Sequence, residues 1–191
     1  MYFMVLANPR SRTKWLSEYL RCSHDLRVGC STVDQFVARL GYVRGTVETS
    51  VAMGYRLWQA MFSRARFVVV HRRPLEVAEA LSRLGGGREV DWPFLYIQDR
   101  ALWEASASRN TVLFSYGSLN NADIRCQLCE WIGVKFDPVW DAEMAGKKIE
   151  IDFAEREREL AERAESIRAF DNDLARRLIA LDVAKVAEGP L

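Results

Sequence analysis

Short apolar runs alternate along this chain with stretches of helical periodicity, and no other feature restricts the possible folds as strongly. Residues 2–7 form a nearly continuous apolar run that ends at Asn8 and Pro9, residues 67–70 read FVVV, and residues 111–114 read TVLF. Uniformly apolar runs of this length are typical of strands that are buried on both faces of a sheet. Each run is followed by residues whose apolar side chains recur at helical spacing.

The helical stretches set the order of the expected elements. They cover residues 11–21, 31–40, 50–64, 74–84, 92–107 and 121–131, and a weaker strand pattern covers residues 41–49. We expect Ser11 and Ser50 to cap two of the helices. Parallel strands need crossover connections, and ligands of such sheets bind at the carboxyl ends of the strands. The sequence therefore predicts an α/β fold with a parallel β-sheet that is flanked by helices on both faces.

The length of 191 residues fits one domain with a terminal extension. We expect an α/β domain over residues 1–150 and a charged helical C-terminal extension over residues 151–191. A charged run at residues 155–159 is followed by a narrow apolar stripe that begins at Leu160 and reaches Leu181. That stripe predicts helices that pack on the domain or on a partner, and a homodimer through these helices is the sharper alternative.

Charge and cysteine content restrict the partners and the location. The 27 basic and 26 acidic residues give a formal charge of +1, so neither nucleic acid nor a membrane surface is expected as a partner. Four cysteines in a chain of this length indicate thiols in a reducing cytoplasm. Cys126 and Cys129 have the spacing of half a zinc site, but they lie in a helical pattern where buried thiols are common. No metal is expected.

Residues 8–15 form the most informative turn, because they join the first strand to the first helix. Backbone N–H groups and the helix dipole already favour an anion there. Arg10, Arg12 and Lys14 add three cations that repel one another unless an anion lies between them. The turn does not match the Walker A pattern, because Trp15 stands where that pattern places a magnesium-binding hydroxyl. The sequence predicts a metal-free cradle for a phosphate or sulfate group.

Residues 9–16 read PRSRTKWL and resemble the 5′-phosphosulfate loop of the sulfotransferase family, Pro-Lys/Arg-Ser-Gly-Thr-Thr/Ser-Trp-Leu. Residues 70–78 read VHRRPLEVA and are similar to the 3′-phosphate motif of that family, Val-x-Arg-Asn-Pro-x-Asp-x-x, with Arg72 and Pro74 retained. Residues 111–119 and 129–134 resemble two later segments of the family. The resemblance keeps the family's order and covers about residues 3–136.

The resemblance implies a divergent sulfotransferase-like enzyme whose donor is 3′-phosphoadenosine 5′-phosphosulfate, used without a metal. The residues that it implies for donor binding are Arg10, Ser11, Arg12, Thr13, Lys14, Trp15 and Arg72. Three positions depart from the pattern, since Arg12 replaces a glycine, Lys14 replaces a hydroxyl residue, and Ala80 stands where the family has a serine that binds the 3′ phosphate. Another nucleotide therefore remains an alternative donor.

Transfer of a sulfuryl group needs cations and a base for the acceptor proton. We expect Arg10 and Lys14 to act as catalytic cations and His24 as the base, since a histidine titrates near neutrality. An exposed loop position is the alternative for His24. His71 is a weaker candidate for the base, because we expect it to pack or to hydrogen-bond at the end of its strand. Glu48 either contacts the acceptor or caps a helix, and capping is the safer prediction.

The leading hypothesis is an enzyme that transfers a sulfuryl group to a hydroxyl or amine. The alternatives are a nucleotide-dependent kinase that acts on a nucleoside or a modified nucleic-acid base, and a non-catalytic nucleotide-binding module. Arg88 follows three glycines and is a candidate lid residue. Trp92, Phe94 and Tyr96 are candidates to line an apolar acceptor pocket, although aromatic residues at such positions more often belong to the core.

Overall fold

A computed structural model describes residues 2–83, 90–149, 158–159 and 161–187. Its centre is a five-stranded sheet in the order β2-β3-β1-β4-β5, in which every neighbouring pair is parallel. The strands are β1 (Phe3–Ala7), β2 (Ser23–His24), β3 (Gly45–Thr49), β4 (Arg66–His71) and β5 (Thr111–Ser115). The predicted parallel α/β sheet is confirmed.

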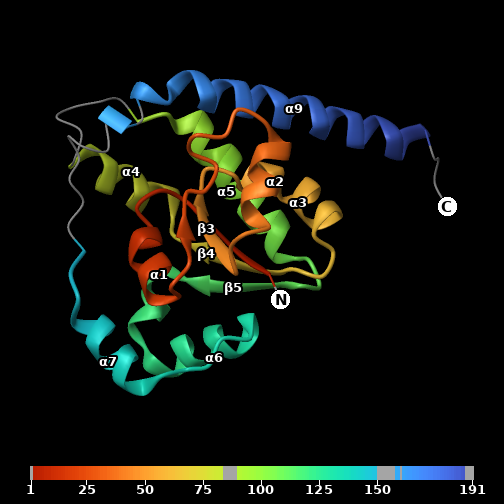
Figure 1. Cartoon of the computed structure of the whole chain (residues 1–191). Coiled ribbons are helices and arrows are strands. Elements are labelled where there is room, and N and C mark those ends of the chain that lie inside the picture. The colour runs from red at the N-terminus through yellow and green to blue at the C-terminus, as the bar shows by residue number, and fades with distance from the viewer. Residues whose placement is uncertain (1, 84–89, 150–157, 160, 188–191) are drawn as a thin grey trace.

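Helices cover both faces of this sheet, as Figure 1 shows. One face packs against α1 (Thr13–Tyr19), α6 (Ala122–Ile132) and α7 (Pro138–Gly146). The other face packs against α2 (Val33–Leu40), the 3-10 turn η1 (Ala52–Gly54), α3 (Tyr55–Met61), α5 (Trp92–Ser106) and α9 (Ala164–Ala187). The helix α4 (Pro74–Ser82) packs beside α5, and the 3-10 turn η2 (Tyr116–Asn120) follows β5. Parallel crossovers produce this three-layer arrangement.

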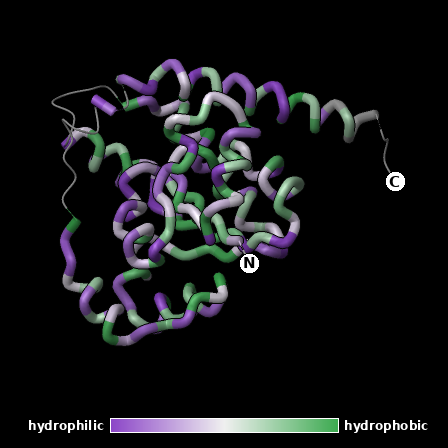
Figure 2. Tube along the Cα trace, in the orientation of Figure 1, coloured by the Kyte–Doolittle hydropathy of each residue, from purple (hydrophilic) through white to green (hydrophobic). Residues whose placement is uncertain are grey.

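Strand alternation sorts the β1 side chains between two core clusters. Phe3, Val5 and Ala7 pack toward α1, whereas Met4 and Leu6 pack toward α5. All five are at most 2% exposed, which is why this strand is a continuous apolar run. Figure 2 shows the same distribution, with hydrophobic residues concentrated in the central strands and polar ones more frequent in the outer helices. The sheet therefore lies at the centre of the core.

The C-terminal helix α9 packs on the domain through its first half. Phe170 and Leu174 are buried in the cluster that contains Trp58, and the Phe170 and Trp58 rings lie 6.5 Å apart. Ion pairs flank this contact, with N–O distances between 2.7 and 3.3 Å. Within the apolar stripe of the sequence, Leu174 is buried and Leu178 packs against the same cluster. The homodimer stays a prediction, as does the domain boundary near residue 150.

Several local predictions are corrected by the structure. Ser11 does not cap α1, because the helix begins at Thr13 and its N-cap residue is Arg12. Ser50 is not a helix cap either, since it lies in the left-handed region (φ 64°) before η1. Gly133 does end α6 in the left-handed region (φ 69°), where glycine is favoured. The candidate lid residue Arg88 lies outside the described residues.

Two searches of the described residues bear on metal and membrane binding. None of the described helices combines the length and the apolarity that a membrane crossing needs. In the same part of the chain, no three His, Cys, Asp or Glu side chains gather as metal ligands do. Cys126 and Cys129 lie on α6 as free thiols, and Cys129 is buried against the Tyr19 hydroxyl. The cytoplasmic location stays a prediction.

Candidate anion-binding site

The turn between β1 and α1 has an unusual backbone. Arg10 (φ 65°) and Arg12 (φ 58°) both lie in the left-handed region, which side chains other than glycine rarely adopt. Each such residue costs roughly 1–3 kcal/mol and persists only where the surroundings enforce it. Turns of this kind direct successive backbone N–H groups into a concave anion-binding site. At the position of Arg12, a glycine would adopt the left-handed conformation without a steric penalty.

Several polar atoms at this turn are buried and unsatisfied. Asn8 and Ser11 are fully buried. The oxygen and the nitrogen of the Asn8 amide and the hydroxyl of Ser11 all lack a hydrogen-bond partner among the described residues. The Nε atom of the partly buried Arg72 also has no hydrogen-bond partner among the described residues. Native proteins leave few buried polar groups unpaired, so a cluster of them points to a bound polar group. The turn therefore fits an anion.

Arg72 joins the turn from the end of β4. Its Nη1 donates to the backbone carbonyl of Arg10, and its guanidinium lies 4.4 Å from the centre of the Tyr116 ring. Burial, followed by the charge of Arg72, lowers the pKa of Arg10. Arg72 also forms an ion pair with Glu76, in which 3.7 Å separates Arg72 Nε from the carboxylate oxygen Oε2, a distance too long for a hydrogen bond. Two guanidinium groups therefore share one partly buried volume, where an anion would reduce their repulsion.

Residues from the end of β5 support the same turn, and the sequence did not single them out. Arg12 Nη1 donates to Asn120 Oδ1 over 2.6 Å, and the Arg12 guanidinium lies 5.3 Å from the centre of the Tyr116 ring. Tyr116 thus contacts both Arg12 and Arg72. Its place directly after a predicted strand was the available signal, since strand ends meet at one edge of a parallel sheet.

The remaining residues of the motif lie on α1. Thr13 is buried in the first turn of the helix, whereas Lys14 is exposed. Trp15 is 8% exposed, stacks on Tyr19 and donates from Nε1 to the carbonyl of Met144 over 2.9 Å. The contacts of Trp15 anchor α1 to α7, so its part in donor binding stays a prediction.

His24 does not lie beside the turn. It belongs to the edge strand β2, where its register partner is Val47, two residues before the end of β3. Because β3 separates β2 from β1, the His24 backbone lies roughly 10 Å from β1. Its Nδ1 is 3.5 Å from a carboxylate oxygen of Asp25. The structure brings Arg10 and Arg72 together but leaves His24 at the sheet edge.

Glu48 is the acidic group on the strand next to β1, and it does not cap a helix. It is fully buried, and its Oε1 accepts from Leu26 N (2.7 Å) and Thr46 Oγ1 (2.6 Å). The other oxygen has no hydrogen-bond partner among the described residues. Burial, with a further contribution from the charge of Asp25, raises the pKa of Glu48 to about 8. A carboxyl group that titrates near neutrality therefore lies one strand from the turn.

His71, at the end of β4, hydrogen-bonds as the sequence predicted. Its Nε2 is 2.8 Å from Asp99 Oδ1 on α5, and its ring lies 4.7 Å from that of Trp103. Of the predicted acceptor-pocket residues, Trp92 lines a cavity of about 530 Å³ between α4 and α5. Phe94 is half-buried against Val77 and its neighbours, and Tyr96 is 61% exposed. Their contact with an acceptor stays a prediction.

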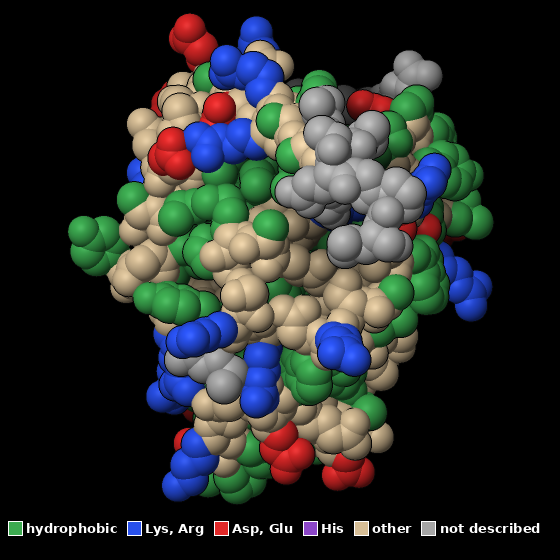
Figure 3. Space-filling model, turned by 90° about the vertical axis from the view of Figure 1, so that its right-hand side faces the viewer, with side chains coloured by type: hydrophobic (Ala, Val, Ile, Leu, Met, Phe, Trp, Pro, Cys, Tyr) green, Lys and Arg blue, Asp and Glu red, His purple; other side chains and the backbone are tan. Residues whose placement is uncertain are grey.

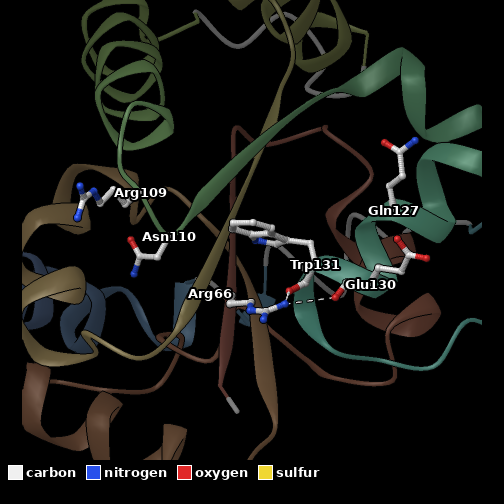
Figure 4. Close-up of a pocket in the computed structure, with 6 residues that line it drawn as sticks. All are labelled: Arg66, Arg109, Asn110, Gln127, Glu130 and Trp131. Atoms are coloured by element: carbon white, nitrogen blue, oxygen red, sulfur yellow. Dashed lines mark hydrogen bonds between the residues drawn. The ribbon is translucent and has the colours of Figure 1, made fainter.

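A second groove lies at the opposite, amino edge of the sheet. Its volume is about 510 Å³, and its lining residues are Arg66, Arg109, Asn110, Gln127, Glu130 and Trp131. Figure 4 shows that Arg66 is held by the end of α6, to whose carbonyl groups it donates, and that Arg109 and Gln127 point apart. On the face in Figure 3, Lys and Arg side chains are scattered instead of forming one continuous patch.

Comparison with solved structures identifies the fold. The chain superposes on the mouse sulfotransferase SULT7A1 complexed with PAP with a TM-score of 0.51 and 14% identity, covering 75% of this chain and 63% of that one. The chain has the fold of the sulfotransferases. The sulfotransferase domain from the curacin biosynthetic pathway gives a TM-score of 0.51 and 13% identity, covering 72% of this chain and 75% of that domain. A sulfotransferase from Alicyclobacillus acidocaldarius gives 0.50 and 12%, covering 91% of this chain and 95% of that one.

No protein-family model and no curated protein matches the chain. The chain spans less than two thirds of the mouse sulfotransferase. At these identities the likeness establishes the fold, and the chemistry has to be argued from the residues at the carboxyl edge of the sheet.

Proposed function

We propose that this protein transfers a sulfuryl group from 3′-phosphoadenosine 5′-phosphosulfate to a hydroxyl or amine acceptor without a metal ion. The observation that carries the proposal is the group of buried, unsatisfied donors at the turn, beside two guanidinium groups that share one volume. A mouse relative of the same fold is complexed with PAP. The residues of the turn fit the sulfated end of such a donor.

The side chains have separate tasks in this proposal. Arg10, Ser11 and the backbone N–H groups of residues 10–13 hold the 5′ end of the donor, and Arg72 holds its 3′ phosphate. When bound, the donor supplies a sulfuryl group, whose sulfur forms a bond to the acceptor oxygen or nitrogen as its bond to the bridging phosphate oxygen breaks. Arg10 and Lys14 stabilise the negative charge on that bridging oxygen. Arg12 supports the turn from the side of β5.

We assign the 3′ phosphate to Arg72. Ala80 has no hydroxyl, and the hydroxyl of nearby Ser82 donates to the carbonyl of Ala78 within the same helix. Among the described residues, this leaves Arg72 as the side chain that we assign to the 3′ phosphate. We expect weaker selection for the 3′ phosphate than a site with an additional hydroxyl would give.

The base has two candidates. His24, the residue favoured by the sequence, lies two strands from β1, so it needs an acceptor that extends over β3. Glu48 lies one strand away, and its pKa of about 8 makes the ionised form, which is the form that accepts a proton, the minor form at neutral pH. A pH–rate profile of His24→Asn and Glu48→Gln separates them, because the variant that lacks the base loses the limb that the base produces.

A non-catalytic nucleotide-binding module is the second candidate function, and the place of His24 at the sheet edge favours it. The kinase alternative gains no such support, because Trp15 is buried where a magnesium-binding hydroxyl is required. Nucleotide binding without transfer to any acceptor distinguishes the module from the enzyme.

Calorimetric titration with adenosine 3′,5′-bisphosphate tests the proposed function. Arg10→Ala and Arg72→Ala should each weaken binding by about tenfold or more, because a charge-assisted hydrogen bond contributes roughly 1.5–3 kcal/mol. Arg109→Ala is the matched control, since this exposed arginine lies at the amino edge. Absence of binding to the native protein, or equal effects of all three substitutions, would contradict the proposal.

A further inference from the structure

A buried ion pair joins α6 to α7 on the face of the sheet that α1 covers. Arg125 is 4% exposed and Asp141 is 5% exposed. Arg125 Nε donates to Asp141 Oδ1 and Arg125 Nη2 donates to Asp141 Oδ2, each over 2.6 Å. The hydroxyl of Tyr19, the last residue of α1, donates to the same Oδ1 atom over 2.8 Å. The proposed transfer gives no task to this ion-pair cluster of Tyr19, Arg125 and Asp141.

The cluster reaches η2, the 3-10 turn that supports the anion-binding turn. Arg125 Nη1 donates to the carbonyl of Leu119 over 3.0 Å. The next residue of η2 accepts the hydrogen bond of Arg12. The ring of Tyr116, the first residue of η2, contacts the guanidinium groups of both Arg12 and Arg72. One guanidinium group on α6 therefore holds the segment that contacts two arginines of the site.

Two other hydrogen bonds tie α1 to α7 without the ion pair. Trp15 Nε1 donates to the carbonyl of Met144 over 2.9 Å. Trp140 Nε1 donates to the carbonyl of Tyr19, also over 2.9 Å. Both bonds would persist without the charges of the cluster, so α1 would keep its place. The contact that depends on the ion pair is the one between Arg125 and η2.

Stability alone is a poor explanation for two charges in these surroundings. Leu128, Ile132 and Met144 belong to the core cluster on the same face of the sheet. Moving two charges out of water is costly, and well-packed apolar residues in place of a buried ion pair often leave stability unchanged or raise it. A guanidinium group, however, donates along fixed directions to a carboxylate and a carbonyl at once. The pair therefore suits a segment whose position has to be accurate.

We propose that Arg125 and Asp141 are positioning residues for the anion-binding site. Asp141 orients the guanidinium group of Arg125, this group fixes η2, and the Tyr116 ring of η2 aligns Arg72 with the 3′ phosphate. The inference rests on the proposed function and adds a determinant of its selectivity for the 3′ phosphate. Without the ion pair, α1 and its turn stay in place, whereas the Tyr116 ring is no longer held and Arg72 loses its alignment.

The test compares the affinities for adenosine 3′,5′-bisphosphate and adenosine 5′-monophosphate by calorimetry. The triple variant combines Arg125→Met and Asp141→Leu with Tyr19→Phe, so that no buried hydroxyl loses its acceptor. Its preference for the bisphosphate should fall about tenfold, the loss expected when a charge-assisted hydrogen bond to the 3′ phosphate is misaligned. Tyr19→Phe alone should keep the native preference, because it leaves the ion pair and the contact with η2 intact.

Two further variants complete the experiment. Arg177→Met with Asp34→Leu removes a bidentate ion pair between α9 and α2, on the other face of the sheet, and should keep the native preference. Arg125→Lys retains the charge next to Asp141, but an ammonium group lacks the fork that reaches a carboxylate and a carbonyl together. It should lower the preference for the bisphosphate and shift the NMR signal of Arg72 Nε–H in the nucleotide-free protein.

Native preference in both the triple variant and Arg125→Lys would overturn the inference, as would an equal loss of preference in the variant of Arg177 and Asp34. Unfolding of the triple variant, together with a native Arg72 signal in Arg125→Lys, would show that the ion pair holds the fold and does not position the site. Failure of the proposed function is distinguishable, because the native protein would then bind neither nucleotide. The Arg72 signal of Arg125→Lys would still decide the inference.

Discussion

The two edges of the sheet use arginine in opposite ways. At the amino edge, Arg66 donates to carbonyl groups at the end of α6 and its guanidinium lies 5.5 Å from the centre of the Trp131 ring. At the carboxyl edge, Arg72 also donates to a carbonyl and contacts an aromatic ring, but its Nε stays unsatisfied beside Arg10. The amino-edge arginine completes a helix end, whereas the carboxyl-edge arginine is left with capacity for a ligand.

This difference shows which structural signal points to a binding site. The amino edge has an open groove of about 510 Å³, yet its side chains diverge. The carboxyl edge has buried unpaired donors and two left-handed arginines within three residues. A bound ligand would explain both the unsatisfied polar atoms and the backbone strain at the carboxyl edge. An open groove does not need a ligand to explain it.

The largest expected effects, on stability and on nucleotide affinity, come from replacing Arg66 and Arg72 in turn with alanine. Arg66→Ala should lower the free energy of unfolding by about 1–3 kcal/mol, because it leaves carbonyl groups of α6 without their donor. Arg72→Ala should reduce affinity for adenosine 3′,5′-bisphosphate with a smaller loss of stability. Urea denaturation and calorimetry on both variants check this contrast. If Arg66→Ala instead weakened nucleotide binding, the assignment of the two edges would be reversed.

A pH effect of intermediate size should come from Glu48. Burial raises its pKa in the folded protein from 4.5 to about 8, so the folded state binds more protons than the unfolded state between these values. Stability from this group is therefore present at low pH and falls as the pH rises toward 8. Glu48→Gln should remove that fall and be more stable than native protein above pH 8, by about 1–3 kcal/mol.

Urea denaturation between pH 5 and 9 measures the effect of Glu48. Glu143→Gln, an exposed carboxylate on α7, is the control and should follow the native curve. The relevant quantity is the free energy of unfolding of the native protein minus that of Glu48→Gln. If this difference rose between pH 5 and 8, Glu48 would be ionised in the folded protein.

The smallest effect concerns strain in the turn. Arg12→Gly should be more stable than Arg12→Ala by about 1 kcal/mol, because glycine adopts the left-handed conformation without a steric penalty. Both variants lose the hydrogen bond to Asn120, so the comparison isolates the backbone. Thermal or chemical denaturation measures the difference. Equal stability of the two variants would mean that the turn relaxes when the side chain is removed.

The sequence predicted the sheet because continuous apolar runs such as residues 2–7 have few other solutions in a globular protein. It also predicted a turn between β1 and α1, and three cations at this strand-to-helix junction made the turn a candidate anion site. Tyr116 and Asn120 were missed, because they contact the turn through residues that are far apart in the chain. His24 was expected near the turn, but a two-residue strand beside Val47 holds it at the sheet edge. Pairing between distant strands is not visible in local periodicity.

The measurement that tests the central claim most directly is an NMR titration of the native protein with adenosine 3′,5′-bisphosphate, followed through the backbone amide signals. The account predicts that the largest shifts fall on residues 10–14 at the carboxyl edge, while Phe67 and Trp131 at the amino edge stay in place. Shifts centred on Phe67 and Trp131, or no saturable shift at residues 10–14, would contradict it.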